Sequence, residues 1–237
     1  MSARLEELDW RSTPWGEISL RRRWDPVFDA EVYEIKLDDD FLMSSMFTAA
    51  EIEMVRLALA DTGEREIDVV VGGLGLGYTA QTVLEYSQVR SLAVIEAVGE
   101  VVEWHQSGLI PAGATLTSDD RCRLVHGDFF ALLRDGGGLD PADSARRFHA
   151  VVVDIDHSPR HVLHPSHADF YTSAGLGRLA ACLHEGGIFS LWSNDPPDDE
   201  FIEVLATVFR DVRAEVVRFD NPLQDHDATN TVYLARV

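Results

Sequence analysis

The sequence contains little lysine, little cysteine and no long apolar segment. Lys36 is the single lysine among 20 basic residues, so catalysis by a lysine nucleophile or Schiff base has almost no candidate. Cys122 and Cys182 are too few for a disulfide framework, and we expect reduced, structural thiols. No stretch of about 18 uninterrupted apolar residues is present, and residues 1–9 are charged and lack the apolar core of a secretion signal. These absences favour a cytoplasmic protein with no membrane partner.

Positive charge is also scarce, because 41 acidic residues against 20 basic ones give a formal net charge of −21. Such a charge repels phosphate backbones and anionic membranes, which argues against nucleic acid as a partner. It is compatible with a cationic partner such as a polyamine, although an acidic surface also serves solubility in general. The 237 residues, of which 46% are hydrophobic, suffice for one α/β domain and a small accessory element.

A glycine cluster lies between two apolar runs and is the most informative stretch of the chain. Residues 67–71 form a β-branched run typical of a buried strand, and residues 78–86 are typical of a helix. Between them, Gly73, Gly75 and Gly77 form a G-x-G-x-G turn, whose backbone N–H groups can approach a ligand at a helix N-terminus. The G-x-G-x-x-G spacing of dinucleotide sites is not met, which disfavours NAD.

Acidic residues follow three successive predicted strands. Glu96 ends the apolar run after the glycines, where nucleotide-binding folds place an acid on the ribose hydroxyls. Gly127 and Asp128 follow a predicted strand at 122–126, and Asp154 follows another at 149–153. Alternating strands and helices predict a parallel sheet, with ligands beyond the carboxyl ends of its strands. The pattern fits an S-adenosyl sulfonium ligand, with Glu96 on the ribose and Asp128 on the adenine amino group; plain turns with solvated acids are the alternative.

Asp154, Asp156 and His157 form a second cluster at this rim. An acid beside a bound amine can accept its proton, so we predict Asp154 or Asp156 as amine-binding group and general base, with His157 as a substitute base. An ordinary loop turn with a hydrogen-bonded histidine is the alternative. The histidines at 157, 161, 164 and 167 do not predict a metal site, because Pro159 and Pro165 disfavour the helix that would place them on one face.

The flanking segments complete the predicted architecture. Alternation in residues 15–42 predicts a small antiparallel β-domain, with the arginines at 21–23 on an edge or face, and we place its boundary at residues 1–46. Thr48 and Glu51 have the spacing of a capping box at the start of a helix, which opens the core at 47–237. We predict a helix at 173–184 stopped by Gly186 and Gly187, a strand at 188–192, a helix at 201–210, and a closing hairpin of strands at 215–219 and 231–235.

On these motifs, the chain resembles the polyamine aminopropyltransferases, the spermidine synthase family, over nearly its full length. The resemblance implies an N-terminal β-domain and a Rossmann-like methyltransferase core with a mostly parallel seven-stranded sheet and a C-terminal antiparallel hairpin. It also implies transfer of the aminopropyl group of decarboxylated S-adenosylmethionine to an amine by direct displacement, with release of methylthioadenosine. No metal or prosthetic group is implied, and we expect a homodimer. In this family Glu96 would bind ribose, Asp128 adenine and the Asp154 loop the attacking amine.

The chain departs from the family pattern on the polyamine side of the site. Gly75 stands where the family has an acid that holds the aminopropyl amine, and Leu42 and Glu51 stand near positions of its diamine-lining residues. Where the family has its catalytic acid followed by proline, this chain has Asp156, His157 and Ser158 before Pro159. We therefore predict a spermidine synthase-like transferase with an unusual amine acceptor. An S-adenosylmethionine-dependent methyltransferase or other alkyl transferase is the second hypothesis, and a non-catalytic nucleoside-binding protein the third.

Overall fold

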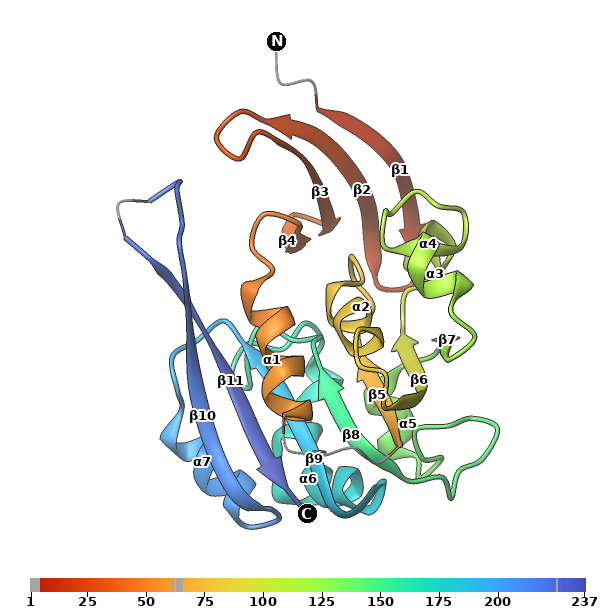
Figure 1. The fold of residues 1–237 in the computed structure, drawn as a ribbon, viewed down its shortest axis with the longest axis vertical. Coiled ribbons are helices and arrows are strands. Elements are labelled where there is room, and N and C mark those ends of the chain that lie inside the picture. The colour runs from red at the N-terminus through yellow and green to blue at the C-terminus, as the bar shows by residue number, and fades with distance from the viewer. Residues whose placement is uncertain (1–4, 61, 63–65, 225) are drawn as a thin grey trace.

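The protein consists of two β-sheets and the helices that cover the larger one (Figure 1). The structure is a computed structural model that describes residues 5–60, 62, 66–224 and 226–237. A four-stranded antiparallel sheet has the order β1-β2-β3-β4, and a seven-stranded sheet has the order β10-β11-β9-β8-β5-β6-β7. The larger sheet is mostly parallel and ends in an antiparallel hairpin. The predicted α/β fold class is confirmed.

The small antiparallel sheet begins before the stretch of residues 15–42 whose alternation predicts it. Its strands are β1 (Glu6–Thr13), β2 (Gly16–Asp25), β3 (Ala30–Leu37) and β4 (Asp40–Ser44). β1 escapes sequence analysis because its alternation is obscured by charged residues. β2 lies between β1 and β3, so the three consecutive arginines sit on an inner strand and form ion pairs with acids of neighbouring strands, such as Arg22 with Glu6 at 2.8 Å and Arg23 with Glu34 at 3.1 Å.

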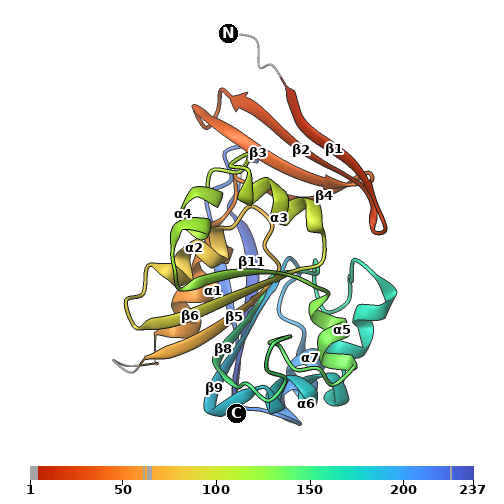
Figure 2. The ribbon, with the colours of Figure 1, turned by 90° about the vertical axis from the view of Figure 1, so that its right-hand side faces the viewer.

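The central strands of the large sheet are buried on both faces, which explains their uninterrupted apolar runs. Its parallel strands are β5 (Ile67–Gly72), β6 (Val89–Glu96), β7 (Cys122–His126), β8 (Phe148–Val153) and β9 (Leu183–Ser193). Along β5, Val69 and Val71 belong to the apolar cluster on one face and Val70 to the cluster on the other. The helices of the two clusters lie on opposite sides of the sheet (Figure 2).

The first face is covered by α1 (Ala49–Leu59), α2 (Tyr78–Leu84), α3 (Gly99–Gln106) and α4 (Gly113–Ser118). The second face is covered by α5 (Phe129–Arg134), the 3-10 helix η1 (Pro165–Tyr171), α6 (Ser173–Ala181) and α7 (Asp199–Ala206). In the part of the chain that the structure describes, no helix has the length and apolar character needed to cross a bilayer.

The structure corrects several predicted boundaries in the C-terminal region, including that of the helix predicted at 201–210, which is α7 and ends at Ala206. The helix predicted to reach residue 184 ends at Ala181, and β9 already begins at Leu183. Gly186 and Gly187 therefore do not stop a helix; they lie in a bulge of β9, where pairing with β8 jumps from Phe148–Leu183 to Ala150–Ile188. The hairpin of β10 (Arg210–Phe219) and β11 (Ala228–Arg236) closes the sheet and is longer than predicted.

The small sheet lies over the rim formed by the carboxyl ends of the parallel strands (Figure 2). The Nε1 atom of Trp104 on α3 donates a hydrogen bond to Asp9 on β1 over 2.8 Å. Trp15, in the turn between β1 and β2, packs edge-on against His164, with 5.8 Å between ring centroids. The boundary predicted at residue 46 falls in the connection between β4 and α1. Through these contacts, the small sheet covers the carboxyl ends of the parallel strands of the large sheet.

Candidate functional site

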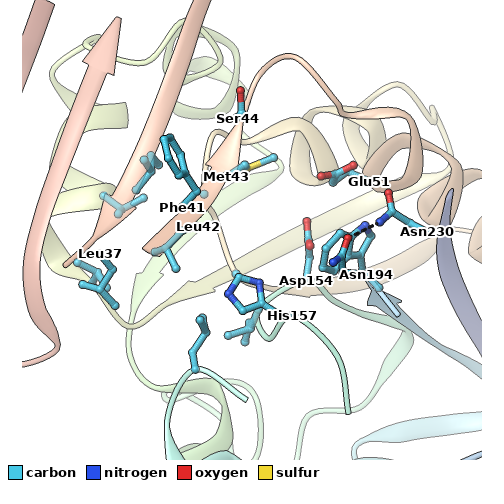
Figure 3. Close-up of a pocket in the computed structure, with 18 of the residues that line it drawn as sticks. Leu37, Phe41, Leu42, Met43, Ser44, Glu51, Asp154, His157, Asn194 and Asn230 are labelled. Atoms are coloured by element: carbon cyan, nitrogen blue, oxygen red, sulfur yellow. Dashed lines mark hydrogen bonds between the residues drawn. The ribbon is translucent and has the colours of Figure 1, made fainter. Parts of the chain in front are cut away.

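A cavity of about 630 Å³ lies between the small sheet and the carboxyl-end rim of the large sheet. Most of the residues predicted for the site line it, namely Gly73, Gly75, Glu96, Asp128, Asp154 and His157. Gly77, Gly127 and Asp156 are not among its lining residues. Figure 3 shows apolar side chains of the small sheet, Leu37, Phe41 and Leu42, on one side of this space and Glu51, Asn194 and Asn230 on the other.

The glycine turn brings the ends of β5 and β8 into close contact. Gly73 has φ 93°, and a Cβ at this position would lie 2.1 Å from the carbonyl oxygen of Asp154. Only glycine fits here, because a side chain would separate the two strand ends. The Gly75 carbonyl accepts a hydrogen bond from Nε2 of His105 over 2.9 Å, and the N–H of Leu76 donates to the Met43 sulfur over 3.2 Å. The turn is thereby fixed between α3 and the small sheet.

Glu96 ends β6 in the cavity and is held by the backbone around it. Its Oε2 accepts a hydrogen bond from Leu74 N over 2.9 Å, and its Oε1 accepts one from Val98 N over 2.8 Å. Burial raises the pKa of Glu96, and these backbone hydrogen bonds oppose the increase. Glu96 lines the cavity, where its carboxylate can accept hydrogen bonds from adjacent hydroxyl groups.

Asp128 is both the N-cap of α5 and a wall of the cavity. Its Oδ1 accepts hydrogen bonds from Phe130 N over 2.9 Å and Ala131 N over 3.0 Å. No partner of Oδ2 occurs among the described residues, so this oxygen is available to an amino group in the cavity. The preceding Gly127 is not required by lack of space, unlike Gly73. A Cβ atom at Gly127 would lie 3.7 Å from its nearest neighbour, which is an ordinary contact.

Glu51, which is buried, and Asp154, which is partly buried, form an acid pair in the cavity. Asp154 follows β8, and its Oδ2 accepts a hydrogen bond from the Thr79 hydroxyl over 2.8 Å. Burial raises the pKa of Asp154 to about 6. Burial and the charge of Asp154 raise the pKa of Glu51 to about 8. Figure 3 shows the two carboxyl groups pointing toward one another. Near neutral pH the pair therefore carries about one negative charge, and it can hold a cationic amine or take up its proton.

The sequence places Glu51 at a helix start and, through the family resemblance, near the acceptor site, but it does not predict the pairing of Glu51 with Asp154. The capping box predicted for it is wrong, because Thr48 makes no side-chain capping hydrogen bond and Glu51 is 7% exposed. A signal was present in the sequence: Glu51 stands three and four positions before Met54 and Val55, on the buried stripe of α1. A charged residue on a buried stripe indicates a cavity or a functional site.

Asp156 supports the loop of residues 155–167 instead of lining the cavity. Its Oδ1 accepts hydrogen bonds from Leu163 N over 2.7 Å and from Nδ1 of His167 over 2.8 Å, and its Oδ2 accepts one from the Tyr171 hydroxyl over 2.8 Å. The side chain is 1% exposed. This placement argues against the catalytic role predicted for Asp156. His157 does line the cavity, and its carbonyl accepts a hydrogen bond from Asn194 N over 2.7 Å.

The histidines of this loop have separate partners. His161 pairs with Asp195 at 2.9 Å, His164 with Ser166 at 2.7 Å, and His167 with Asp156. Across the described ranges, no group of three or more histidine, cysteine and acidic side chains is arranged to hold a metal ion.

The end of the cavity beyond the acid pair is built from β9, β11 and the connection between β10 and β11. Trp192 lies near the carboxyl end of β9, and Asn194 directly follows this strand. Asn230 lies on the neighbouring strand β11, and all three residues line the cavity. Asn230 Nδ2 donates a hydrogen bond to Asn194 Oδ1 over 3.1 Å. The indole N–H of Trp192 is buried and has no hydrogen-bond partner among the described residues. Among the described residues, the side chains that line this end carry no formal charge.

Comparison with known proteins decides the family. A family model described as the spermine/spermidine synthase domain matches residues 50–217, which is more than half of the chain. The chain belongs to the spermine/spermidine synthase family. The matched region contains the acid pair, the glycine turn, Glu96 and Asp128, whereas the small sheet and β11 lie outside it.

Solved spermidine synthases share the fold of this family member. A spermidine synthase crystallised with the transition-state analogue AdoDATO is 17% identical, with a TM-score of 0.74, over 97% of this chain and 73% of that one. The spermidine synthase from Thermotoga maritima is 18% identical, with a TM-score of 0.72, over 97% of this chain and 72% of that one. The predicted resemblance is confirmed at the level of family and fold.

Proposed function

We propose that this protein is a transferase that moves the aminopropyl group of decarboxylated S-adenosylmethionine to an amine acceptor. The observation that carries the proposal is the acid pair of Glu51 and Asp154, which shares one cavity with Glu96 and Asp128. Membership of the spermine/spermidine synthase family supports it. The cavity thus combines groups for a nucleoside with an acid pair for amines.

The adenosyl half of the donor fits the ends of β6 and β7. Glu96, fixed by two backbone N–H groups, would accept hydrogen bonds from the ribose hydroxyls. Asp128 Oδ2 would accept one from the adenine amino group. This arrangement would place the sulfonium near the turn of Gly73 and Gly75, beside the end of β8. A positively charged sulfur is favoured there by the negative charge of the acid pair.

The reaction is a direct displacement at carbon. The nitrogen of a neutral amine attacks the propyl carbon bonded to the sulfonium; the C–N bond forms, the C–S bond breaks, and its electron pair stays on sulfur in neutral methylthioadenosine. The new secondary amine bears a positive charge, and Asp154 accepts its extra proton. Because Asp154 has its pKa raised only to about 6, it is ionised near neutral pH and ready for this role. The protein otherwise contributes alignment of the two reactants.

The charges of the cavity favour the decarboxylated donor over intact S-adenosylmethionine. In the part of the chain that the structure describes, no lysine or arginine lines the cavity. The carboxylate of intact S-adenosylmethionine would therefore lie near Glu51 and Asp154 without a cationic partner, which is costly. The ammonium of the decarboxylated donor would instead find the acid pair. Glu51 would thereby supply the carboxylate for the aminopropyl amine that is missing from the glycine turn, where Gly75 stands.

A product assay tests the proposal. The protein is incubated with each sulfonium donor and a panel of amines, and products are measured by mass spectrometry. We expect an aminopropyl mass gain and methylthioadenosine from the decarboxylated donor alone. Methyl transfer from S-adenosylmethionine would instead support a methyltransferase. Failure of both donors to bind in calorimetry would reject both activities and favour a non-catalytic protein.

A further inference from the structure

His105 on α3 is a buried histidine that the proposed reaction does not use. It is 1% exposed, and its ring packs against the glycine turn. A Cβ atom at Gly77 would lie 2.9 Å from Cε1 of His105, so the ring occupies space that a side chain at Gly77 would need. This contact gives Gly77 a role behind the cavity, although Gly77 is not among its lining residues.

The ring of His105 carries its proton on Nε2. The Gly75 carbonyl oxygen can only accept a hydrogen bond, and it lies 2.9 Å from Nε2, so Nε2 is the donor. Nδ1 is buried and has no hydrogen-bond partner among the described residues. A second proton on Nδ1 would therefore be buried without an acceptor, and burial lowers the pKa of His105. His105 is thus a neutral histidine with one N–H, which is directed at the turn.

The residue that His105 holds belongs to the wall of the nucleoside site. Gly75 lines the cavity, whereas His105 does not. Leu74 N donates a hydrogen bond to Glu96 Oε2 over 2.9 Å, and the N–H of Gly75 is a further backbone donor to Glu96. The carbonyl of Gly75 is therefore fixed by His105, while its N–H engages Glu96. Through the backbone of the turn, His105 can act on Glu96 without touching a ligand.

We propose that His105 is a positioning residue for the nucleoside half of the donor. This inference rests on the proposed function, in which Glu96 binds the ribose hydroxyls. Glycine has little conformational preference of its own, so the turn needs restraint from outside. By holding the Gly75 carbonyl, the N–H of His105 keeps the N–H groups of Leu74 and Gly75 directed at Glu96, and the Glu96 carboxylate stays where the ribose meets it.

Packing of the ring is the competing explanation for a histidine at this position. Atoms of Ala112 and Leu116 would also lie 2.9 and 3.0 Å from a Cβ atom at Gly77, so the ring is one part of a closely packed contact. Packing requires the shape of the ring, whereas positioning requires its N–H. Two substitutions separate these requirements. His105→Gln keeps an N–H donor without a ring, and His105→Phe keeps a ring without an N–H.

Calorimetric titration with methylthioadenosine tests the inference. We expect His105→Phe to raise Kd about tenfold, because the Gly75 carbonyl loses its hydrogen-bond partner, and His105→Gln to stay within about threefold of the wild type. A Kd for His105→Gln equal to or above that for His105→Phe would overturn the inference, as would a wild-type Kd in His105→Phe. Either result would leave aminopropyl transfer intact. If the wild type does not bind methylthioadenosine, the proposed donor site fails and the inference with it.

Turnover gives a second readout of the same variants. A residue that acts on nucleoside binding should change KM for decarboxylated S-adenosylmethionine in step with Kd and leave kcat within about threefold. A His105→Phe variant with reduced kcat and an unchanged KM would overturn the inference, because the loss would then lie in the chemical step or in the fraction of active protein.

A variant of the same helix controls for loss of stability. Val102→Ala shortens a side chain of α3 that is 7% exposed and does not line the cavity. It should lower the urea midpoint, as a buried truncation does, and leave Kd for methylthioadenosine unchanged. If Val102→Ala raises Kd as much as His105→Phe does, affinity follows the stability of α3, and the specific role of the His105 N–H is overturned.

Discussion

At the scale of single residues, the cavity carboxylates differ in how their oxygens are engaged. Glu96 accepts backbone hydrogen bonds on both of its oxygens, whereas Asp128 accepts backbone hydrogen bonds from Phe130 and Ala131 on Oδ1. Glu51 and Asp154 instead influence one another, and burial raises the pKa of each. The surroundings of each carboxylate therefore determine what it can bind. Glu96 and Asp128 are suited to neutral hydrogen-bond donors, whereas Glu51 and Asp154 are suited to protons and cations.

Replacement of Glu96 should weaken nucleoside binding. We expect Glu96→Ala to reduce the affinity for methylthioadenosine by about 1–3 kcal/mol, since hydrogen bonds from the ribose to a carboxylate are lost. Isothermal titration calorimetry measures the change. Glu100→Ala is a matched control, because Glu100 lies in the first turn of α3 and does not line the cavity. Equal affinities of the wild type and Glu96→Ala would exclude Glu96 from ribose binding.

Replacement of Asp154 should affect turnover more than binding. The asparagine of Asp154→Asn can still accept the Thr79 hydrogen bond but cannot accept a proton, so we expect kcat to fall on the order of 10²-fold or more. The affinity for methylthioadenosine should stay within a few-fold, because the nucleoside contacts are elsewhere. Single-turnover rates and calorimetry on the same variant measure the two effects. If Asp154→Asn turns over as fast as the wild type, Asp154 is not the base, and His157 becomes the candidate for that role.

Residues at strand ends are predictable from sequence, and residues within elements are not. Glu96, Asp128 and Asp154 each follow an apolar run, so their position at the rim follows from the parallel sheet alone. Glu51 lies inside a helix, where the helical pattern accounts for it without a ligand. Its role depends on which elements the tertiary fold brings together.

At the scale of elements, the loop of residues 155–167 is positioned by Asp156. Asp156→Asn should lower the free energy of unfolding by about 1–3 kcal/mol, because an amide oxygen and an amide N–H cannot replace two acceptor oxygens that serve three donors. Urea unfolding measures the loss. Asp120→Asn, at an exposed position before β7, should change it by less than about 0.5 kcal/mol. An Asp156→Asn variant that is as stable as the wild type but has strongly reduced turnover would contradict the structural role and support the catalytic role predicted for Asp156.

Elements with strong apolar runs are predicted well, and elements with mixed patterns are not. β5 and β8 are found within a residue of their bounds because both faces of the sheet are buried around them, and the edge strand β7 is found at its bounds from a shorter apolar pattern. β1 is missed because both its faces are rich in charge, and the start of β9 is misplaced because its glycines imitate a helix stop. The glycines in fact absorb a register change, which only the pairing with β8 reveals.

At the scale of the whole molecule, the small sheet encloses a cavity rich in acids in a chain of net charge −21. Burying Glu51 and Asp154 without a cationic partner opposes folding in the absence of ligand, since the ionised forms lose hydration. A cationic ligand would relieve this cost. Stability in the ligand-free protein should therefore depend on pH through the acid pair.

The ligand-free protein should become less stable as the pH rises from 6.5 to 8. In the unfolded chain Glu51 ionises near its ordinary pKa of 4.5, whereas in the folded protein its pKa is raised to about 8. The folded state therefore binds the extra proton in this window, and the free energy of unfolding falls with pH. The slope approaches about 1.4 kcal/mol per pH unit for one proton. Below pH 6.5, burial of His105, which lowers its pKa, acts in the opposite direction and reduces the slope.

Urea unfolding at constant ionic strength across pH 6.5 to 8 measures this dependence. Glu51→Gln supplies the control, because glutamine does not ionise and most of the slope should disappear while the fold is kept. Saturating methylthioadenosine should leave the slope of the wild type largely unchanged, since the nucleoside carries no charge to pair with Glu51. A wild-type stability that rises with pH in this window, or an unchanged slope in Glu51→Gln, would show that Glu51 is not held protonated by burial beside Asp154.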